Sequence, residues 1–253
     1  MIPKIIHYVW FSDGPLPELQ QKCLDSWKRY CPDYEIKRWN ADNFDVNCCD
    51  FVKEAYAARK WAFVTDYIRL YVLYHEGGIY MDTDVYIRGN LDCFLDNKFF
   101  SFIEDNKFSD GREIVRIQAA FMGGEKGHSF LKECLKYYEK MHFDHRYETQ
   151  STDLLCPEIL AALAGKGYGF QRKNIEQLML NDGLNIYSNE WCAECMENIR
   201  NSNIAVHCCT GSWREYSMWQ KIKNELKKIK VLRRIFGKKT TLEKLEELER
   251  SRT

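Results

Sequence analysis

Two aspartates stand two residues apart in the segment 77–85, which reads GGIYMDTDV. A short apolar run precedes Asp82, and this predicts a strand that ends at the first carboxylate. Asp82 and Asp84 can bind one cation if the chain turns between them, and carboxylate oxygens suit Mn²⁺ or Mg²⁺. Such a cation has open positions for a diphosphate and neutralises its charge. The other interpretation of a bare D-x-D is a pair of solvated turn acids.

A second charged pair lies just upstream, on the segment 60–76. Apolar and aromatic residues recur there at spacings of three and four, which predicts a helix that ends at Gly77-Gly78 with an αL cap. Asp66 and Arg69 are three residues apart and therefore share one face of that helix. Arg69 could contact a phosphate, and Asp66 a ribose or sugar hydroxyl. The alternative is a local ion pair with only a structural role.

The elements that must position these residues follow an α/β pattern. The chain opens with a predicted strand over 2–11, a helix over 17–30 and a strand over 34–39. This β-α-β order favours an α/β sheet that binds a nucleotide at the ends of its strands. Further helices are predicted over 50–58, 128–142 and 154–165, and further strands over 79–81, 85–87, 99–103, 114–122, 184–187 and 204–207.

Composition is that of an ordinary globular protein. The 253 residues are 45% apolar and 29% charged, which fits one large α/β domain or a domain with a small appendage. The eleven cysteines follow no secretory leader, and no run of about 18 apolar residues predicts a spanning helix. We therefore expect a cytoplasmic protein whose cysteines are mostly buried. Cys192 and Cys195 form a lone C-x-x-C, which is weak evidence for a zinc or redox site, and their role stays open. The adjacent pairs at 48–49 and 208–209 are interpreted as structural.

The C-terminal tail differs in charge from the rest of the chain. The segment 221–239 holds nine lysines and arginines and one glutamate, while its apolar residues recur at three or four. This pattern is typical of an amphipathic helix on an anionic membrane surface, and the alternative is a helix packed on the domain. We predict a catalytic domain over 1–216 and a basic tail over 217–253. No recognition motif for nucleic acid accompanies the basic residues, so no nucleic-acid partner is expected.

Three motifs of this chain resemble those of glycosyltransferase family 32. The first is the opening strand IPKIIHYVWF, which contains Tyr8 and Trp10. The second is AFVTDYIRL, which contains Asp66 and Arg69, and the third is GGIYMDTDV. A later His207 followed by GSW also resembles the family's C-terminal motif. The family includes initiating mannosyltransferases and bacterial surface-polysaccharide enzymes, and it is similar to the catalytic domain of the large glucosylating toxins.

This resemblance implies a GT-A type α/β fold, a divalent cation that is usually manganese, and retention of anomeric configuration. Trp10 would stack on the base of the donor, with Tyr8 nearby, and Tyr80 would help seat the nucleotide. Asp66 and Arg69 would hold the ribose, sugar or phosphate, Asp82 the ribose and metal, and Asp84 the metal more directly.

The C-terminal motif and the middle of the chain supply the remaining expectations. The resemblance implies that His207 completes the metal site and that Ser212 and Trp213 cover the diphosphate on a closing loop. Gln118 occupies the place of a family asparagine that faces the donor sugar, and its role stays open. Gln150, Asp153 and Glu158 fall in the acceptor-side region without an assigned role.

The sequence therefore predicts a retaining, metal-dependent transferase that moves a hexose from a nucleotide sugar. A UDP-hexose is the favoured donor and GDP-mannose is possible. The expected acceptor is a saccharide or lipid-linked saccharide in bacterial surface-polysaccharide synthesis, at the inner face of the membrane. Two alternatives stay open. One is a haloacid-dehalogenase-like phosphatase using Asp82 and Asp84, and the other is a non-catalytic module that binds nucleotide sugars.

Overall fold

A computed structural model describes residues 1–107, 113–144, 155–209 and 239–250 of the chain. The chain divides into two units, Met1–Cys209 and Thr210–Thr253. The second unit is described only at its end, where α8 (Thr241–Arg250) forms a helix. The predicted boundary at 216–217 lies outside the described residues, as does nearly all of the basic segment 221–239. Among the helices that are described, none has both the length and the apolar character required to cross a bilayer.

The first unit is built on a mixed sheet in the order β2-β1-β3-β7-β5-β9-β8, with β6 paired to β5. Strand β3 runs parallel to β1 and antiparallel to β7, so the direction of the sheet changes beside β3. A smaller sheet has the order β10-β11-β4. The strands are β1 (Ile5–Val9), β2 (Glu35–Trp39), β3 (Gly78–Met81), β4 (Val85–Ile87), β5 (Phe99–Lys107), β6 (Glu113–Ile117), β7 (Phe121–Gly124), β8 (Gln177–Leu180), β9 (Leu184–Tyr187), β10 (Cys192–Ala193) and β11 (Ala205–His207).

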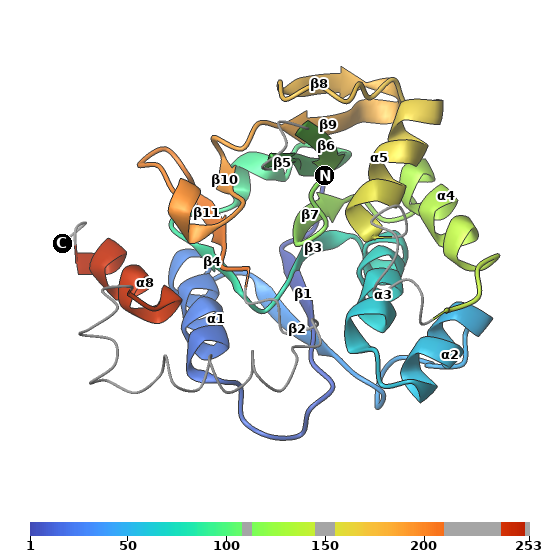
Figure 1. Cartoon of the computed structure of the whole chain (residues 1–253), viewed down its shortest axis with the longest axis horizontal. Helices are drawn as coiled ribbons and strands as arrows, with labels where there is room; N and C mark the ends of the chain where they lie inside the picture. The colour runs from blue at the N-terminus through green and yellow to red at the C-terminus, as the bar shows by residue number, and fades with distance from the viewer. Residues whose placement is uncertain (108–112, 145–154, 210–238, 251–253) are drawn as a thin grey trace. The chain divides into compact units, whose positions relative to one another are not determined.

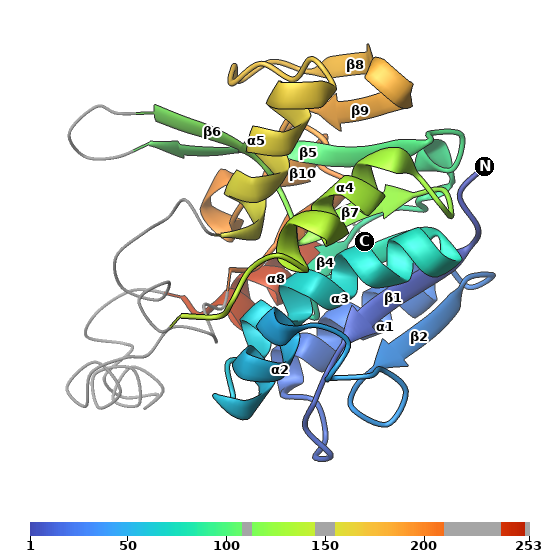
Figure 2. The same ribbon diagram turned by 90° about the vertical axis from the view of Figure 1, so that its right-hand side faces the viewer.

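Helices cover both faces of the main sheet, and each face has its own hydrophobic core (Figures 1 and 2). Helix α1 packs on one face, together with β4 and the small sheet. The other helices of the first unit pack on the opposite face. This helix-flanked mixed sheet confirms the α/β architecture that the resemblance to the GT-A fold implied. The helices are α1 (Glu18–Tyr30), α2 (Asp50–Ala57), α3 (Trp61–Glu76), α4 (Ser129–Tyr138) and α5 (Cys156–Gly167).

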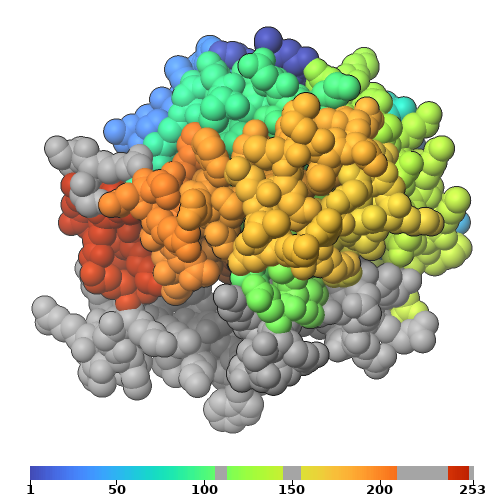
Figure 3. All heavy atoms as spheres, turned by 90° about the horizontal axis from the view of Figure 1, so that it is seen from above, coloured from blue at the N-terminus to red at the C-terminus, as the bar shows by residue number. Residues whose placement is uncertain are grey.

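Two helices have the largest part in fixing the region around Asp82. Helix α1 buries Cys23 and Trp27, and the Trp27 indole N–H donates to the carbonyl of Val85 at 2.8 Å, which ties α1 to β4. Helix α3 is buried around much of its circumference and buries even Asp66 and Arg69. Segment 155–209 forms a continuous surface over one face of the unit, yellow to orange in Figure 3.

Most predicted elements are confirmed, and the differences have local causes. The predicted strand over 114–122 is wrong as one element: β6 and β7 are separate strands joined by residues 118–120. Strands β8 and β10 were not predicted. Gly77 ends α3 with a φ of 73° as expected of a glycine cap, but its ψ of −174° is not that of the αL region. The glycine is still required there because φ is positive.

Replacing Gly123 in β7 with alanine should destabilise the fold. A Cβ at this position would lie 2.3 Å from Cε1 of Phe100, whose ring is fully buried, and 3.1 Å from the carbonyl oxygen of Gly78. We expect the overpacked core to lower the free energy of unfolding by about 1–3 kcal/mol in urea titrations. Gly167→Ala is the matched control, because the nearest atom to its Cβ is a side-chain oxygen at 3.8 Å. An unchanged midpoint for Gly123→Ala would contradict this packing.

The buried His7 should make stability depend on pH. Its Nε2–H donates to the carbonyl of Gly77 at 2.8 Å and its Nδ1 accepts from the Trp39 indole at 3.0 Å, so the ring is held neutral. Burial lowers the pKa of His7 below 6.5. The contribution of the neutral His7 to the free energy of unfolding is therefore complete above pH 6.5. It is lost as pH falls through the folded-state pKa, by at most about 1.4 kcal/mol per pH unit.

Urea titrations between pH 5 and 7.5 check this expectation. His7→Gln should reduce the loss of unfolding free energy between pH 7.5 and pH 5. His142→Gln should not, because the pKa of His142 is raised by its hydrogen bond to Glu54 and its contribution is lost as pH rises. Equal acid slopes in wild type and His7→Gln would show that His7 does not titrate in this way.

Candidate functional site

The two aspartates of the D-x-D motif lie in a tight turn between β3 and β4. The Asp82 N–H donates to the carbonyl of Ala120 at 2.8 Å, and the Val85 N–H donates back to the carbonyl of Asp82 at 2.9 Å. The second bond joins residues i and i+3 and closes a β-turn. The turn that two converging carboxylates require is therefore present.

His207, near the C-terminal end of the first unit, lies beside the two aspartates. Strand β11 pairs antiparallel with β4 so that His207 lies opposite Val85. Its Nε2 lies 3.3 Å from Oδ1 of Asp84. One ligand atom from each of Asp82, Asp84 and His207 lies within 4.8 Å of the other two. Two carboxylate oxygens and one imidazole nitrogen form a donor set that could hold a divalent cation, and the cation site itself remains a prediction.

Arg69 joins Asp66 to the D-x-D motif. Its Nη2 lies 3.2 Å from Oδ1 of Asp66 and 3.4 Å from Oδ1 of Asp82, and its Nη1 donates to the carbonyl of Ala119 at 3.0 Å. The Tyr80 hydroxyl donates to the same oxygen of Asp82 at 2.6 Å. The local ion pair between Asp66 and Arg69 therefore exists, but it is also part of a buried cluster that holds Asp82.

Burial and the neighbouring charges set the protonation of this cluster. Burial raises the pKa of Asp66 to about 7. Burial alone would lower the pKa of Arg69, but Asp82, Tyr80 and Asp66 outweigh it and raise that pKa well above its usual value. Burial, followed by the charge of Asp82, raises the pKa of Tyr80 well above 10. Tyr80 thus remains a hydroxyl donor and Arg69 a cation at neutral pH.

The pair of Asp84 and His207 shows a similar balance. Burial lowers the pKa of His207, but the hydrogen bond and charge of Asp84 outweigh burial and raise the pKa well above 6.5. Without a bound cation, the imidazole therefore carries a proton that pairs with Asp84.

Trp10 and Tyr8 lie at the end of β1, beside β3. The indole N–H of Trp10 is buried and has no hydrogen-bond partner among the described residues. A buried unsatisfied donor of this kind is uncommon and suits a group that a ligand completes. The ring of Tyr8 packs edge-on to Trp27 at 5.9 Å, inside the core beneath α1. The donor-binding roles of Trp10 and Tyr8 remain predictions.

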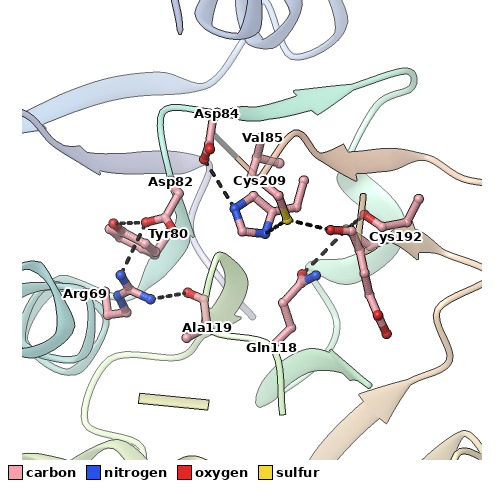
Figure 4. A network of polar contacts seen from close by, with 12 residues as sticks. Arg69, Tyr80, Asp82, Asp84, Val85, Gln118, Ala119, Cys192 and Cys209 are labelled. Carbon is pink, nitrogen blue, oxygen red and sulfur yellow. Dashed lines mark hydrogen bonds and ion pairs between the residues drawn. The ribbon is translucent and has the colours of Figure 1, made fainter. Parts of the chain in front are cut away.

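Gln118 lies in the link between β6 and β7 and is 1% exposed. Its Oε1 accepts from the thiol of Cys192 at 3.5 Å, on the side of the site where Cys209 also lies (Figure 4). Gln118 is therefore buried beside Cys192, and its contact with a sugar remains a prediction.

The remaining predicted residues contribute less to this geometry. Ser212 and Trp213 lie outside the described residues, as do Gln150 and Asp153. Glu158 accepts from Arg116 Nε at 3.1 Å and from Arg172 Nη1 at 3.0 Å. These two arginines balance the negative charge of Glu158 within the protein.

Sequence reasoning missed the residues behind His207. The Cys209 thiol donates to the carbonyl of Glu194 at 2.8 Å, and its sulfur lies 3.5 Å from Nδ1 of His207. The sequence interpretation of Cys208-Cys209 as a structural pair does not include these contacts. The available signal was position alone, because Cys209 follows a candidate ligand by two residues.

Known proteins match the part of the chain that contains the D-x-D motif. The family model described as glycosyltransferase sugar-binding region containing DXD motif matches residues 17–101. This span contains Asp66, Arg69, Tyr80 and both aspartates of the motif. Among solved structures, the PaToxG glycosyltransferase aligns with this chain at a TM-score of 0.48 and 15% identity. The alignment covers 65% of this chain and 69% of the PaToxG chain.

Two fungal relatives are similar over more than half of the chain. Inositol phosphoceramide mannosyltransferase 3 of Schizosaccharomyces pombe is 29% identical over 162 residues, which is 58% of this chain and 40% of the relative. Mannosyl phosphorylinositol ceramide synthase of Saccharomyces cerevisiae is 30% identical over 161 residues, 56% of this chain and 37% of the relative. The chain thus spans less than half the length of these relatives. The family match identifies residues 17–101 as similar to a DXD-containing glycosyltransferase sugar-binding region, and the chain is similar over part of its length to these two mannosyl-transferring relatives.

Proposed function

We propose that this chain is a divalent-cation-dependent glycosyltransferase that moves a hexose from a nucleotide-sugar donor to an acceptor hydroxyl. The observation that carries the proposal is the convergence of Asp82, Asp84 and His207 within 4.8 Å. Both aspartates lie in the span 17–101 that matches the DXD-containing sugar-binding region. The residues of the site supply two carboxylate oxygens, an imidazole nitrogen and a buried guanidinium, groups that suit a cation-bound diphosphate.

Each residue has a distinct part in this proposal. Asp82, Asp84 and His207 hold the cation, which when bound neutralises the charge of the diphosphate leaving group. Arg69 and Tyr80 hold the carboxylate of Asp82 in place from the protein side, so that it does not have to reorganise when the donor binds. Asp66 keeps Arg69 oriented. Trp10 offers its indole to the base, with Tyr8 behind it, and Gln118 faces the sugar.

The same proposal assigns the last step of binding to the segment after Cys209. The resemblance to family 32 implies that Ser212 and Trp213, which lie outside the described residues, would cover the diphosphate and exclude water, which would protect the donor from hydrolysis. The acceptor hydroxyl attacks the anomeric carbon from the face that the leaving group vacates, and the leaving phosphate takes its proton. The product then retains the anomeric configuration of the donor, as the resemblance to family 32 implies.

The relatives narrow the substrate that we propose. Both named relatives transfer mannose to an inositol-containing sphingolipid, according to their names. We therefore propose mannose as the transferred hexose, from GDP-mannose, and a lipid-linked hydroxyl as the acceptor. A UDP-hexose donor and a surface-polysaccharide acceptor are the second candidate. The net charge of +8 over 221–239 is suited to an anionic membrane surface, where a lipid-linked acceptor would lie.

The two rival functions predict different products. Among the described residues, Asp82 contacts Arg69 and Tyr80, and Asp84 contacts His207. Incubation with Mn²⁺ and a panel of nucleotide sugars should release nucleoside diphosphate. Release of inorganic phosphate from sugar phosphates would instead support the phosphatase. Tight, Mn²⁺-dependent binding of GDP or UDP without turnover on any acceptor would support the binding module.

Replacing Asp84 with asparagine should abolish the cation site. The variant loses a charged ligand and the partner of His207, so Mn²⁺ affinity should fall by more than the roughly 10-fold loss typical of altering a group outside the coordination sphere. Isothermal titration with Mn²⁺, alone and with GDP or UDP, measures the loss. Asp96→Asn is the control, because Asp96 is exposed. If Asp84→Asn keeps wild-type Mn²⁺ affinity and turnover, the proposed site is wrong.

A comparison of Tyr80→Phe with Tyr187→Phe should separate an effect on nucleotide binding from an effect on stability. It removes the 2.6 Å hydrogen bond to Asp82, so we expect a loss of about 2 kcal/mol in unfolding free energy together with weaker Mn²⁺-dependent nucleotide binding. Tyr187→Phe removes a 3.1 Å bond to Asn97, and we expect a loss of about 1 kcal/mol with unchanged binding. Urea titration and calorimetry check both. Equal nucleotide affinities in the two variants would contradict a role for Tyr80 in seating the nucleotide.

A further inference from the structure

The proposed cation site leaves one nitrogen of His207 to be accounted for. Nε2 faces Asp84 at 3.3 Å, and Nδ1 lies on the other side of the ring, 3.5 Å from the sulfur of Cys209. A histidine that binds a metal through one nitrogen almost always donates the other N–H to a fixed acceptor, which sets both the tautomer and the ring orientation. Cys209 occupies the place of that acceptor.

The hydrogen atoms around Cys209 determine the direction of these bonds. A thiol has one hydrogen to donate. A carbonyl oxygen can only accept, so the thiol hydrogen goes to the carbonyl of Glu194, 2.8 Å away. The sulfur can then only accept from the imidazole. Nδ1 of His207 therefore carries a hydrogen, and the lone pair of a neutral ring is left on Nε2, toward Asp84.

The backbone fixes all three members of this chain of hydrogen bonds. Strand β10 pairs in parallel with β11, with Ala193 opposite Val206. The next residue along the chain is Glu194 after Ala193 and His207 after Val206. The Cys208 N–H donates to the carbonyl of Asp84 at 2.8 Å, which anchors the chain just before Cys209. Cys209 itself has a φ of 49°, a left-handed conformation that non-glycine residues adopt at a cost.

We propose that Cys209 is a positioning residue for the cation site: its sulfur accepts from Nδ1 of His207, its thiol is anchored on Glu194, and together they present Nε2 to the cation. This proposal rests on the proposed function, because it requires that His207 is a ligand. Cys209 does not touch the cation or the substrate. It acts only through the orientation and tautomer of the imidazole.

Two measurements on the full chain test this proposal. The first is Mn²⁺ affinity by electron paramagnetic resonance, which reads the cation site without turnover. The second is a long-range ¹H–¹⁵N spectrum of histidine-labelled protein saturated with Mg²⁺, which distinguishes a hydrogen on Nδ1 from one on Nε2. The variants are Cys209→Ala, Cys209→Ser, which keeps a donor and an acceptor, and Cys93→Ala as a control on another exposed cysteine. Melting in EDTA checks that each variant is folded.

We expect the Nδ1–H tautomer of His207 in wild type. Cys209→Ala should bind Mn²⁺ about 10-fold to 100-fold more weakly and should lose the single tautomer. Cys209→Ser should recover most of the affinity, and Cys93→Ala should match wild type. If wild type binds Mn²⁺ and Cys209→Ala binds it equally well with the same tautomer, the positioning role is overturned while the cation site stands. If wild type binds no Mn²⁺, the cation site itself is wrong and the positioning role falls with it.

Discussion

The site depends on a guanidinium buried between two carboxylates. Arg69 is 6% exposed and contacts Asp66 on its own helix and Asp82 at the end of β3. Removing one member of such a buried set leaves an uncompensated charge, which typically costs about 3–5 kcal/mol. Helix α3, the end of β3 and the link at Ala119 are therefore held in one arrangement by the same side chain. The carboxylate of Asp82 is oriented before any ligand arrives.

The opposite half of the site is held by the pairing of strands rather than by buried charge. Asp84 leads into β4, and β4 pairs with β11, whose last residue is His207. Helix α1 secures β4 through the hydrogen bond from Trp27 to Val85. Two independent supports thus meet at one β-turn: a charged cluster behind Asp82 and a small sheet behind Asp84. This division explains why neighbouring aspartates have such different surroundings.

Local sequence signals predicted the parts of the structure that local forces determine. The periodicity of α1 and α3 and the glycines after α3 were sufficient to place Asp66, Arg69 and the D-x-D turn. The break at 118–120 was missed because the run 114–122 contains neither proline nor glycine to interrupt it. Strand β10 has only two residues, too few for any periodicity. The contact between Cys209 and His207 depends on a left-handed backbone at Cys209, which residue types do not reveal.

The antiparallel pairing of β4 with β11 joins residues that are far apart in the chain, since Val85 lies opposite His207. Contacts between distant segments form only after the loop between them closes, so such pairings tend to come late in folding. During synthesis, both aspartates leave the ribosome long before the histidine does. A nascent chain therefore holds an incomplete set of cation ligands until β11 has paired, and strong cation binding would report that the whole first unit has assembled.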